Sequence, residues 1–188
     1  MARKENQRIM LTKQLLQNAL LKMLQNMPLH AVSIRELCKE AGINRTTFYN
    51  HYGSQYDLLS EISQRFLDSI AVRLDSADAA DRESVHQRVA MVLAYMAENR
   101  DLSVLLLNNN LDPSFAERIF SLPQIGELFT AALGNGRDEQ ERAATMSFVI
   151  HGSYKLLLDW INHENRLPAR EQTELMLGLA QRVCRQGG

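Results

Sequence analysis

Residues 32–59 read VSIRELCKEAGINRTTFYNHYGSQYDLL, and they carry the most specific pattern in the chain. The pattern predicts two short helices around a glycine turn, followed by the start of a third helix. Ser33 and Glu36 have the spacing of a capping box, which begins the first of these helices. Gly42 is the residue best able to end that helix in a left-handed conformation.

The same stretch also contains start signals for the next two helices. Asn44 can cap a short helix over the residues that follow it, and Ser54 with Asp57 repeats the capping-box spacing. A two-helix unit of this size is a common device for placing one helix in the major groove of DNA. These residues therefore predict a helix-turn-helix that binds DNA.

Helical periodicity continues on both sides of this unit, and no segment shows sustained alternation of apolar and polar residues. We therefore predict an all-α fold. The other predicted helices cover residues 8–26, 84–99, 138–163 and the stretch after Pro168. Residues 75–83 are polar and lack periodicity, which predicts a linker, and residues 108–113 and 133–136 contain turn signals.

Bulk composition is that of an ordinary globular protein. Of 188 residues, 45% are hydrophobic and 23% are charged, so the chain can bury a core. The apolar runs are too short to span a membrane and no export leader opens the chain, so we expect a cytoplasmic location. Cys38 and Cys184 lie far apart without a metal-binding or disulfide spacing, which fits two reduced thiols.

Charge is divided unevenly along the chain. Residues 1–55 hold eight Lys/Arg and three acids, a net charge of +5, whereas the remaining residues have a net charge of -6. A basic segment on an acidic body suits a head that binds a polyanion and a body that does not. Chance placement of surface charges is the other explanation of this feature.

The helix-turn-helix and the start of the next helix resemble the N-terminal domain of the TetR family of bacterial transcription regulators. The resemblance covers about residues 8–65, and a weaker one to a TetR subgroup involves His151, Gly152, Trp160, Ile161 and Pro168. The matching segments are Ser33–Leu37, Ala41–Ile43, Thr47–Tyr49, His51–Tyr52 and Asp57–Leu59. The resemblance implies an N-terminal three-helix DNA-binding domain over residues 1–55. It also implies a helical dimerisation and ligand-binding domain over residues 56–188.

Phe48 and Tyr52 are four residues apart and should share a buried face, which turns their neighbours outward. Arg and Asn can read guanine and adenine edges, and a Thr methyl can contact thymine. Family positions that touch the DNA backbone correspond to Tyr49 and His51. The predicted DNA-contacting residues are Ser33, Arg35, Asn44, Arg45, Thr46, Thr47, Tyr49, Asn50, His51 and Gln55.

Each of these roles has an alternative. Arg45 and Asn50 are also compatible with ordinary solvated side chains, and His51 with a half-buried structural histidine. Arg35 could pair with an acidic residue on its own helix. Gln55 departs from the family, which usually has a lysine there to anchor a phosphate; the loss of that charge predicts a shallower salt dependence of DNA binding.

The remaining residues should dimerise the head, regulate it, or both. Residues 138–163 and the final helix are the expected pair for a two-fold four-helix interface, so the operator should be palindromic. The resemblance also implies a pocket for a small, uncharged or amphipathic effector. Core packing is the other explanation of the residues that could line it. These candidates are Tyr95, Met96, Phe120, Phe129, Met146, His151 and Tyr154.

Two other classes of function are alternatives to an effector-controlled regulator. An enzyme is disfavoured because the chain lacks a phosphate-binding glycine loop, a nucleophile elbow and a metal cluster; His163–Glu164 has no second histidine at zinc spacing. We therefore expect no catalytic residue, no cofactor and no bound metal. The second alternative is an architectural or division-linked DNA-binding protein of the same fold that has no effector.

Overall fold

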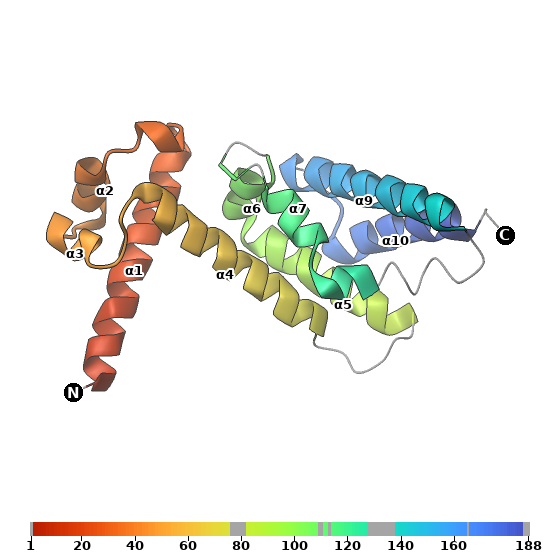
Figure 1. The fold of residues 1–188 in the computed structure, drawn as a ribbon, viewed down its shortest axis with the longest axis horizontal. Helices are drawn as coiled ribbons and strands as arrows, with labels where there is room; N and C mark the ends of the chain where they lie inside the picture. The colour runs from red at the N-terminus through yellow and green to blue at the C-terminus, as the bar shows by residue number, and fades with distance from the viewer. Residues whose placement is uncertain are drawn as a thin grey trace. The chain divides into compact units, whose positions relative to one another are not determined.

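The computed structural model describes residues 2–75, 82–108, 111–112, 114–127, 138–164 and 166–185. Within those ranges every regular element is a helix and there is no β-strand, which confirms the predicted all-α fold (Figure 1). Contacts between residues divide the chain into two compact units, residues 1–66 and 67–188. The division falls inside one helix.

The first unit is a small helical domain built on a long first helix. It contains α1 (Ala2–Leu24), a 3-10 turn η1 (Leu29–Ala31), α2 (Ile34–Ala41), α3 (Arg45–Tyr49) and the first part of α4 (Gln55–Asp75). The helix α1 begins earlier than predicted because residues 2–7 contain no helix breaker and continue the helix in polar, helix-forming residues. The core side chains with no exposed surface are Leu16, Leu20, Leu37, Phe48 and Leu58.

Backbone capping positions α2, and the predicted signals are confirmed. The hydroxyl of Ser33 accepts a hydrogen bond from the backbone N–H of Glu36 at 3.2 Å and donates to the Glu36 carboxylate at 2.8 Å. At the other end of α2, Gly42 has φ 66° and its N–H bonds back to the last turn. These bonds satisfy groups that a helix end would otherwise leave without partners.

The next two helices are capped in a similar way. The side chain of Asn44 accepts from the N–H of Thr46 at 2.9 Å, which begins α3. The Ser54 hydroxyl accepts from the N–H of Asp57 at 3.3 Å, and the Asp57 carboxylate accepts from the N–H of Gly53 at 2.9 Å. In a capping box the Asp57 carboxylate would accept from the N–H of Ser54, but here it accepts from Gly53, the residue before it. Both α3 and α4 therefore begin with a side-chain cap.

The second unit is a helical body formed by the rest of α4 and by α5 (Arg82–Glu98), α6 (Arg100–Leu107), α7 (Phe115–Phe120), α9 (Glu139–Asn162) and α10 (Ala169–Arg185). The helix α10 packs against both α5 and α9, and α6 packs against α9 (Figure 1). Predicted bounds for α9 agree with the structure, since the Asp138 side chain caps its first turn through the N–H of Glu141 at 2.7 Å.

The predicted linker and turns fall mostly where the structure gives no description. Asp75 ends α4, and residues 82–83 already belong to α5, so the polar segment between these helices is shorter than predicted. The turn predicted at residues 133–136 lies outside the described residues. Among the described helices, none has the length and hydropathy needed to cross a bilayer.

Candidate nucleic-acid interface and body cavity

The short helix α3 is oriented by one buried aromatic side chain. Phe48 has no exposed surface, and its ring lies 5.7 Å from that of Tyr52 and 5.4 Å from that of Tyr49, measured between centroids. Tyr52 is also buried, whereas Tyr49 is half exposed. Because Phe48 and Tyr52 fix the inner face of the helix, the opposite face is presented to solvent.

That outer face carries the side chains predicted to read base edges. Arg45, Thr46 and Asn50 are all exposed beside Tyr49. Among the other predicted DNA contacts, Ser33, Arg35 and Asn44 are exposed, while Thr47, His51 and Gln55 are half-buried. All of them lie in the first compact unit, at the ends of α2, on α3, and at the start of α4.

The two arginines of this surface keep their charges unpaired within the described part of the chain. No hydrogen bond or ion pair joins Arg35 or Arg45 to another described residue. The acidic residues of α2 are engaged elsewhere, because Glu40 pairs with Lys22 of α1 and Glu36 bonds Ser33. Intrahelical pairing of Arg35, the alternative drawn from sequence, is therefore not observed.

A second group of charged residues joins α1 to α4 behind the interface. The Glu61 carboxylate accepts from Lys13 Nζ at 2.8 Å and also pairs with Arg65. Lys13 Nζ lies 5.4 Å from the centroid of the Tyr52 ring, a cation–π distance. Arg65 in turn donates to Gln17 of α1 at 3.5 Å. These residues hold α4, the helix that follows α3, against α1.

The network shifts the ionisation of two of its members. Burial favours the neutral form of Glu61, but the hydrogen bond from Lys13 and the charge of Arg65 outweigh it, so the pKa of Glu61 lies below its ordinary value. Burial, followed by the charge of Glu61, raises the pKa of Tyr52. Glu61 is therefore an anion and Tyr52 a neutral phenol at neutral pH.

One exposed aromatic residue of this surface was missed from sequence. Tyr56, in the first turn of α4, is 52% exposed and follows Gln55 directly. Exposed tyrosines next to a helix start can donate to phosphate oxygens. Its position beside the Ser54 cap was the available signal, and we add Tyr56 to the candidate backbone contacts.

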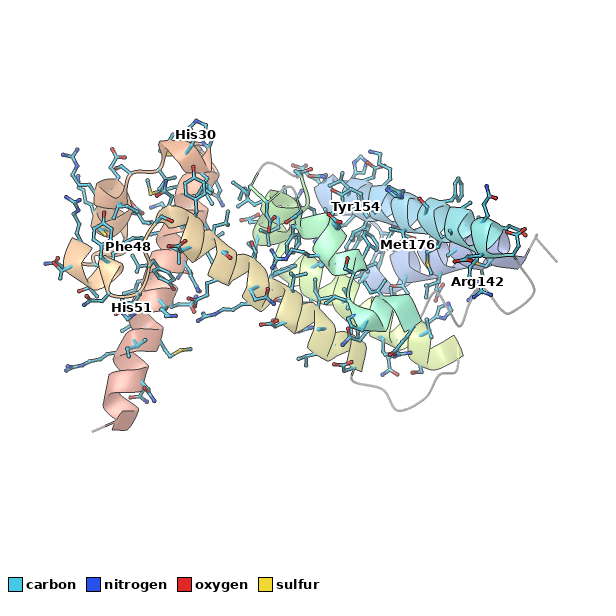
Figure 2. The ribbon with its side chains drawn as sticks, in the orientation of Figure 1. His30, Phe48, His51, Arg142, Tyr154 and Met176 are labelled. Atoms are coloured by element: carbon cyan, nitrogen blue, oxygen red, sulfur yellow. The ribbon has the colours of Figure 1, made fainter. Side chains whose placement is uncertain are left out.

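The second unit contains an apolar cavity of about 150 Å³. Helices α4, α5, α7, α9 and α10 and the segment after α7 contribute its walls. Two of the residues predicted to contact an effector, Met96 and Phe120, line it. The edge of the Phe120 ring also packs on Tyr154, with centroids 6.1 Å apart (Figure 2).

The other predicted effector residues lie elsewhere. The guanidinium carbon of Arg73 lies 3.9 Å from the centroid of the Tyr95 ring. Met146 packs against the small cluster of Val149 and Cys184. Neither residue lines the cavity, because each is turned toward a neighbouring helix.

The two polar candidates on α9 also do not line the cavity. Tyr154 donates its hydroxyl to the carbonyl of Leu107 at 2.5 Å, at the end of α6. His151 is exposed, and its Nδ1 donates to the carbonyl of Ser147 at 2.7 Å within the same helix. Phe129 lies outside the described residues.

Several cavity residues were not selected from sequence. Val85, Val89 and Val92 recur at helical spacing on α5, and all three line the cavity together with Met96. Periodicity identifies the inner face of α5. It cannot show whether that face packs directly against a neighbouring helix or lines an empty cavity. The tertiary packing alone made that distinction.

Family models match both units of the chain. A model described as bacterial regulatory proteins, tetR family, matches residues 18–62. A model described as a transcriptional regulator C-terminal region matches residues 83–182, more than half of the chain. The chain belongs to the TetR family. As a member of it, the protein is a DNA-binding transcriptional regulator.

Solved TetR-family structures share this fold across nearly the whole chain. A regulator from Streptococcus agalactiae 2603V is 17% identical with a TM-score of 0.73, covering 96% of this chain and 99% of its own. The dihydroxyacetone kinase operon activator DhaS is 18% identical with a TM-score of 0.62, covering 93% and 96%.

A third structure was solved with a ligand. FadR of Thermus thermophilus, a repressor in complex with lauroyl-CoA, is 20% identical with a TM-score of 0.57, covering 89% and 92%. The search of curated proteins found no match. At these identities the structural similarities show the fold alone. The ligand of each relative, and whether it activates or represses transcription, are properties of that relative.

Proposed function

We propose that this TetR-family chain is a cytoplasmic homodimeric repressor that binds a palindromic operator and is released by a small uncharged or amphipathic molecule. One observation carries the proposal. The buried side chain of Phe48 orients α3 so that Arg45, Thr46, Tyr49 and Asn50 are exposed together, with Arg45 unpaired among the described residues. That arrangement suits a helix that reads base edges in the major groove.

Each exposed side chain has a role in this proposal. Arg45 donates to guanine, Asn50 pairs with adenine, and the Thr46 methyl contacts thymine. Tyr49 and His51 contact phosphates. Ser33 places the start of α2, an eight-residue helix, toward a phosphate, where the helix dipole favours an anion.

The proposed dimer uses the free faces of α9 and α10. The helix α9 buries Val149, Leu157 and Trp160 in its own unit but leaves the Phe148 side chain 66% exposed. On α10, Leu175 and Leu179 are 42% and 36% exposed. A Cβ built on Gly152 meets nothing within 4 Å, so a partner helix has room to approach there. Exposed apolar faces on two adjacent helices support a four-helix interface.

The proposed effector site is the body cavity. Its walls come from α4, which also belongs to the first unit, and from α9 and α10, which form the proposed dimer face. A ligand that changes the packing of these helices would favour one arrangement of the dimer over another, and its differential affinity would set the extent of release.

The decisive experiment is selection of binding sites from random DNA, followed by affinity measurements on the selected site. A palindrome bound much more tightly than its isolated half-site is expected. Arg45→Met should weaken binding by about 5- to 150-fold and relax base preference at one position per half-site. Lys22→Met removes the same charge from a side chain that pairs with Glu40, and it serves as the control.

Two results would count against the proposal. Equal affinity for the half-site and the full site would contradict the dimeric reader. Many scattered genomic sites, together with a metabolite screen in which nothing raises the melting temperature or releases DNA, would favour the effector-independent architectural role.

A further inference from the structure

The walls of the body cavity are chemically uniform. Their side chains come almost entirely from Val, Leu, Ile, Met and Phe, and none of them is Asp, Glu, Lys, Arg or His. A charged ligand placed there would lose its hydration without gaining a partner, at a cost that apolar contact does not offset. The cavity therefore excludes an ionised head group from its interior.

The volume of the cavity limits the size of its ligand. Pockets for drug-sized molecules range over roughly 300–1,000 Å³, whereas this cavity measures about 150 Å³. An apolar cavity of about this volume is large enough for one benzene-sized molecule. A twelve-carbon acyl chain, such as the one bound by the Thermus thermophilus relative, does not fit in this space.

Two polar side chains interrupt the apolar lining. Ser153 of α9 and Gln181 of α10 both line the cavity, and neither bonds another residue in the described ranges. The helices α9 and α10 are antiparallel neighbours, and Val149 packs against Cys184. Ser153 is one turn after Val149 on α9, and Ala180 and Gln181 are about one turn before Cys184 on α10. In this register Ser153 lies opposite Ala180 and Gln181. The free hydroxyl and amide therefore lie in the same part of the wall.

We propose that the cavity binds a neutral, ring-sized, mainly hydrocarbon molecule that carries one hydroxyl or carbonyl group. The ring occupies the apolar space between α5 and α10, and its polar group bonds Gln181, with Ser153 beside it. This inference rests on the proposed effector function and names the chemical class of the effector. Benzene derivatives with a single hydroxyl are the simplest members of the class.

The test uses the full-length protein and four probes: toluene, p-cresol, dodecanoate and lauroyl-CoA. Toluene and p-cresol should each bind once per chain by calorimetry and raise the melting temperature, with p-cresol binding more tightly. Methyl NMR reports the location of binding. Met96 and Met176 line the cavity and their resonances should shift, while Met10 of the first unit should not; Met176 is labelled in Figure 2.

Variants separate the polar contact from the space itself. Gln181→Leu should weaken p-cresol about three- to tenfold, the range of one neutral hydrogen bond, and leave toluene binding unchanged. Ala180→Leu fills the cavity and should abolish binding of both probes. Ala31→Leu makes the same change at an exposed position in the other unit and should have no effect.

The outcomes separate this inference from the function on which it rests. If dodecanoate or lauroyl-CoA bind while the aromatic probes do not, or if no probe shifts Met96 and Met176, the proposed ligand class is overturned. Operator release is measured separately for each probe that binds. Binding at the two methionines without release would support the ligand class and would contradict release by an effector.

Discussion

Single residues set the geometry of the DNA-binding head through backbone conformation as much as through side-chain chemistry. Gly42 has φ 66°, and a Cβ built on it meets no atom within 4 Å. The requirement for glycine is therefore one of backbone conformation and not of space. This turn sets the angle at which the chain leaves α2 and enters α3.

A pair of glycine substitutions tests that statement. Gly42→Ala should destabilise the protein by about 1 kcal/mol because an L-residue is strained in the left-handed region. Gly178→Ala lies inside α10, where the new Cβ would meet the Arg182 side chain at an ordinary 3.7 Å, and it should stabilise the protein by about 0.5–1 kcal/mol. Urea unfolding of both variants measures the difference, and equal effects would contradict the backbone explanation.

Gln55 offers a second prediction at this scale. It is the first residue of α4 and is half-buried, with no charge to offer a phosphate. Gln55→Lys should add about one phosphate contact and steepen the slope of log affinity against log salt by about 0.9. Gln64→Lys adds the same charge further along α4, and its slope should stay close to that of the original protein. An unchanged slope for Gln55→Lys would refute the contact.

At the scale of elements, ion pairs and caps join helices that are distant in sequence. Lys13, Glu61 and Arg65 connect α1 to α4 in the head. In the body, Arg100 at the start of α6 donates to the carbonyls of Ile161 and Asn162, at 3.0 and 3.1 Å, and so caps the end of α9. Both connections use charged groups where a helix end or a half-buried acid needs a partner.

The head network predicts a dependence of stability on pH. The pKa of folded Glu61 lies below its ordinary value of 4.5, so its contribution to stability is full above about pH 4.5 and disappears as the pH falls through the folded pKa. The protein should therefore lose melting temperature on acidification. Glu61→Gln should be less stable at neutral pH and should show a shallower acid decline.

Glu40→Gln is the control for this network, because Glu40 belongs to a more exposed pair with Lys22. Its acid decline should match that of the unsubstituted protein, since exposed ion pairs contribute little. If Glu61→Gln retained the full acid decline, other carboxylates would have to be responsible for it.

The proposed dimer depends on an apolar surface of α9 and α10 that a single chain leaves exposed to solvent. Phe148 is the most exposed large hydrophobic side chain of α9, and it lies on the face that includes Gly152. A single chain presents one recognition helix, whereas a palindrome requires two at a fixed spacing. Dimerisation through α9 and α10 would therefore determine operator affinity.

Phe148→Glu should weaken dimerisation at least tenfold, because both copies of the substitution would place a charge in the apolar interface. Sedimentation should show monomers at concentrations where the unsubstituted protein is dimeric, and affinity for the full operator should fall with it. Val72→Glu is the matched control, since Val72 of α4 is also 66% exposed. Equal loss of dimer in both variants would place the interface elsewhere.

Local sequence patterns were enough to predict most of the helices and the residues at which they begin. Ser33, Gly42 and Asn44 act within a few residues of their own positions, so the local pattern was sufficient to predict the caps they form. The outward face of α3 followed for the same reason, because Phe48 and Tyr52 are related by one helical turn. Exposure of Arg45, Thr46, Tyr49 and Asn50 could be predicted from this local geometry.

The position of the cavity in the body, and the side chains that face it, depend on how several helices pack together. Tyr95, Met146 and Tyr154 were expected to line an effector pocket, yet their partners are Arg73, the Val149–Cys184 cluster and the Leu107 carbonyl. The cavity instead lies where α4, α5, α9 and α10 fail to fill the space between them. A void is a property of several helices packed together, and no single helical repeat encodes it.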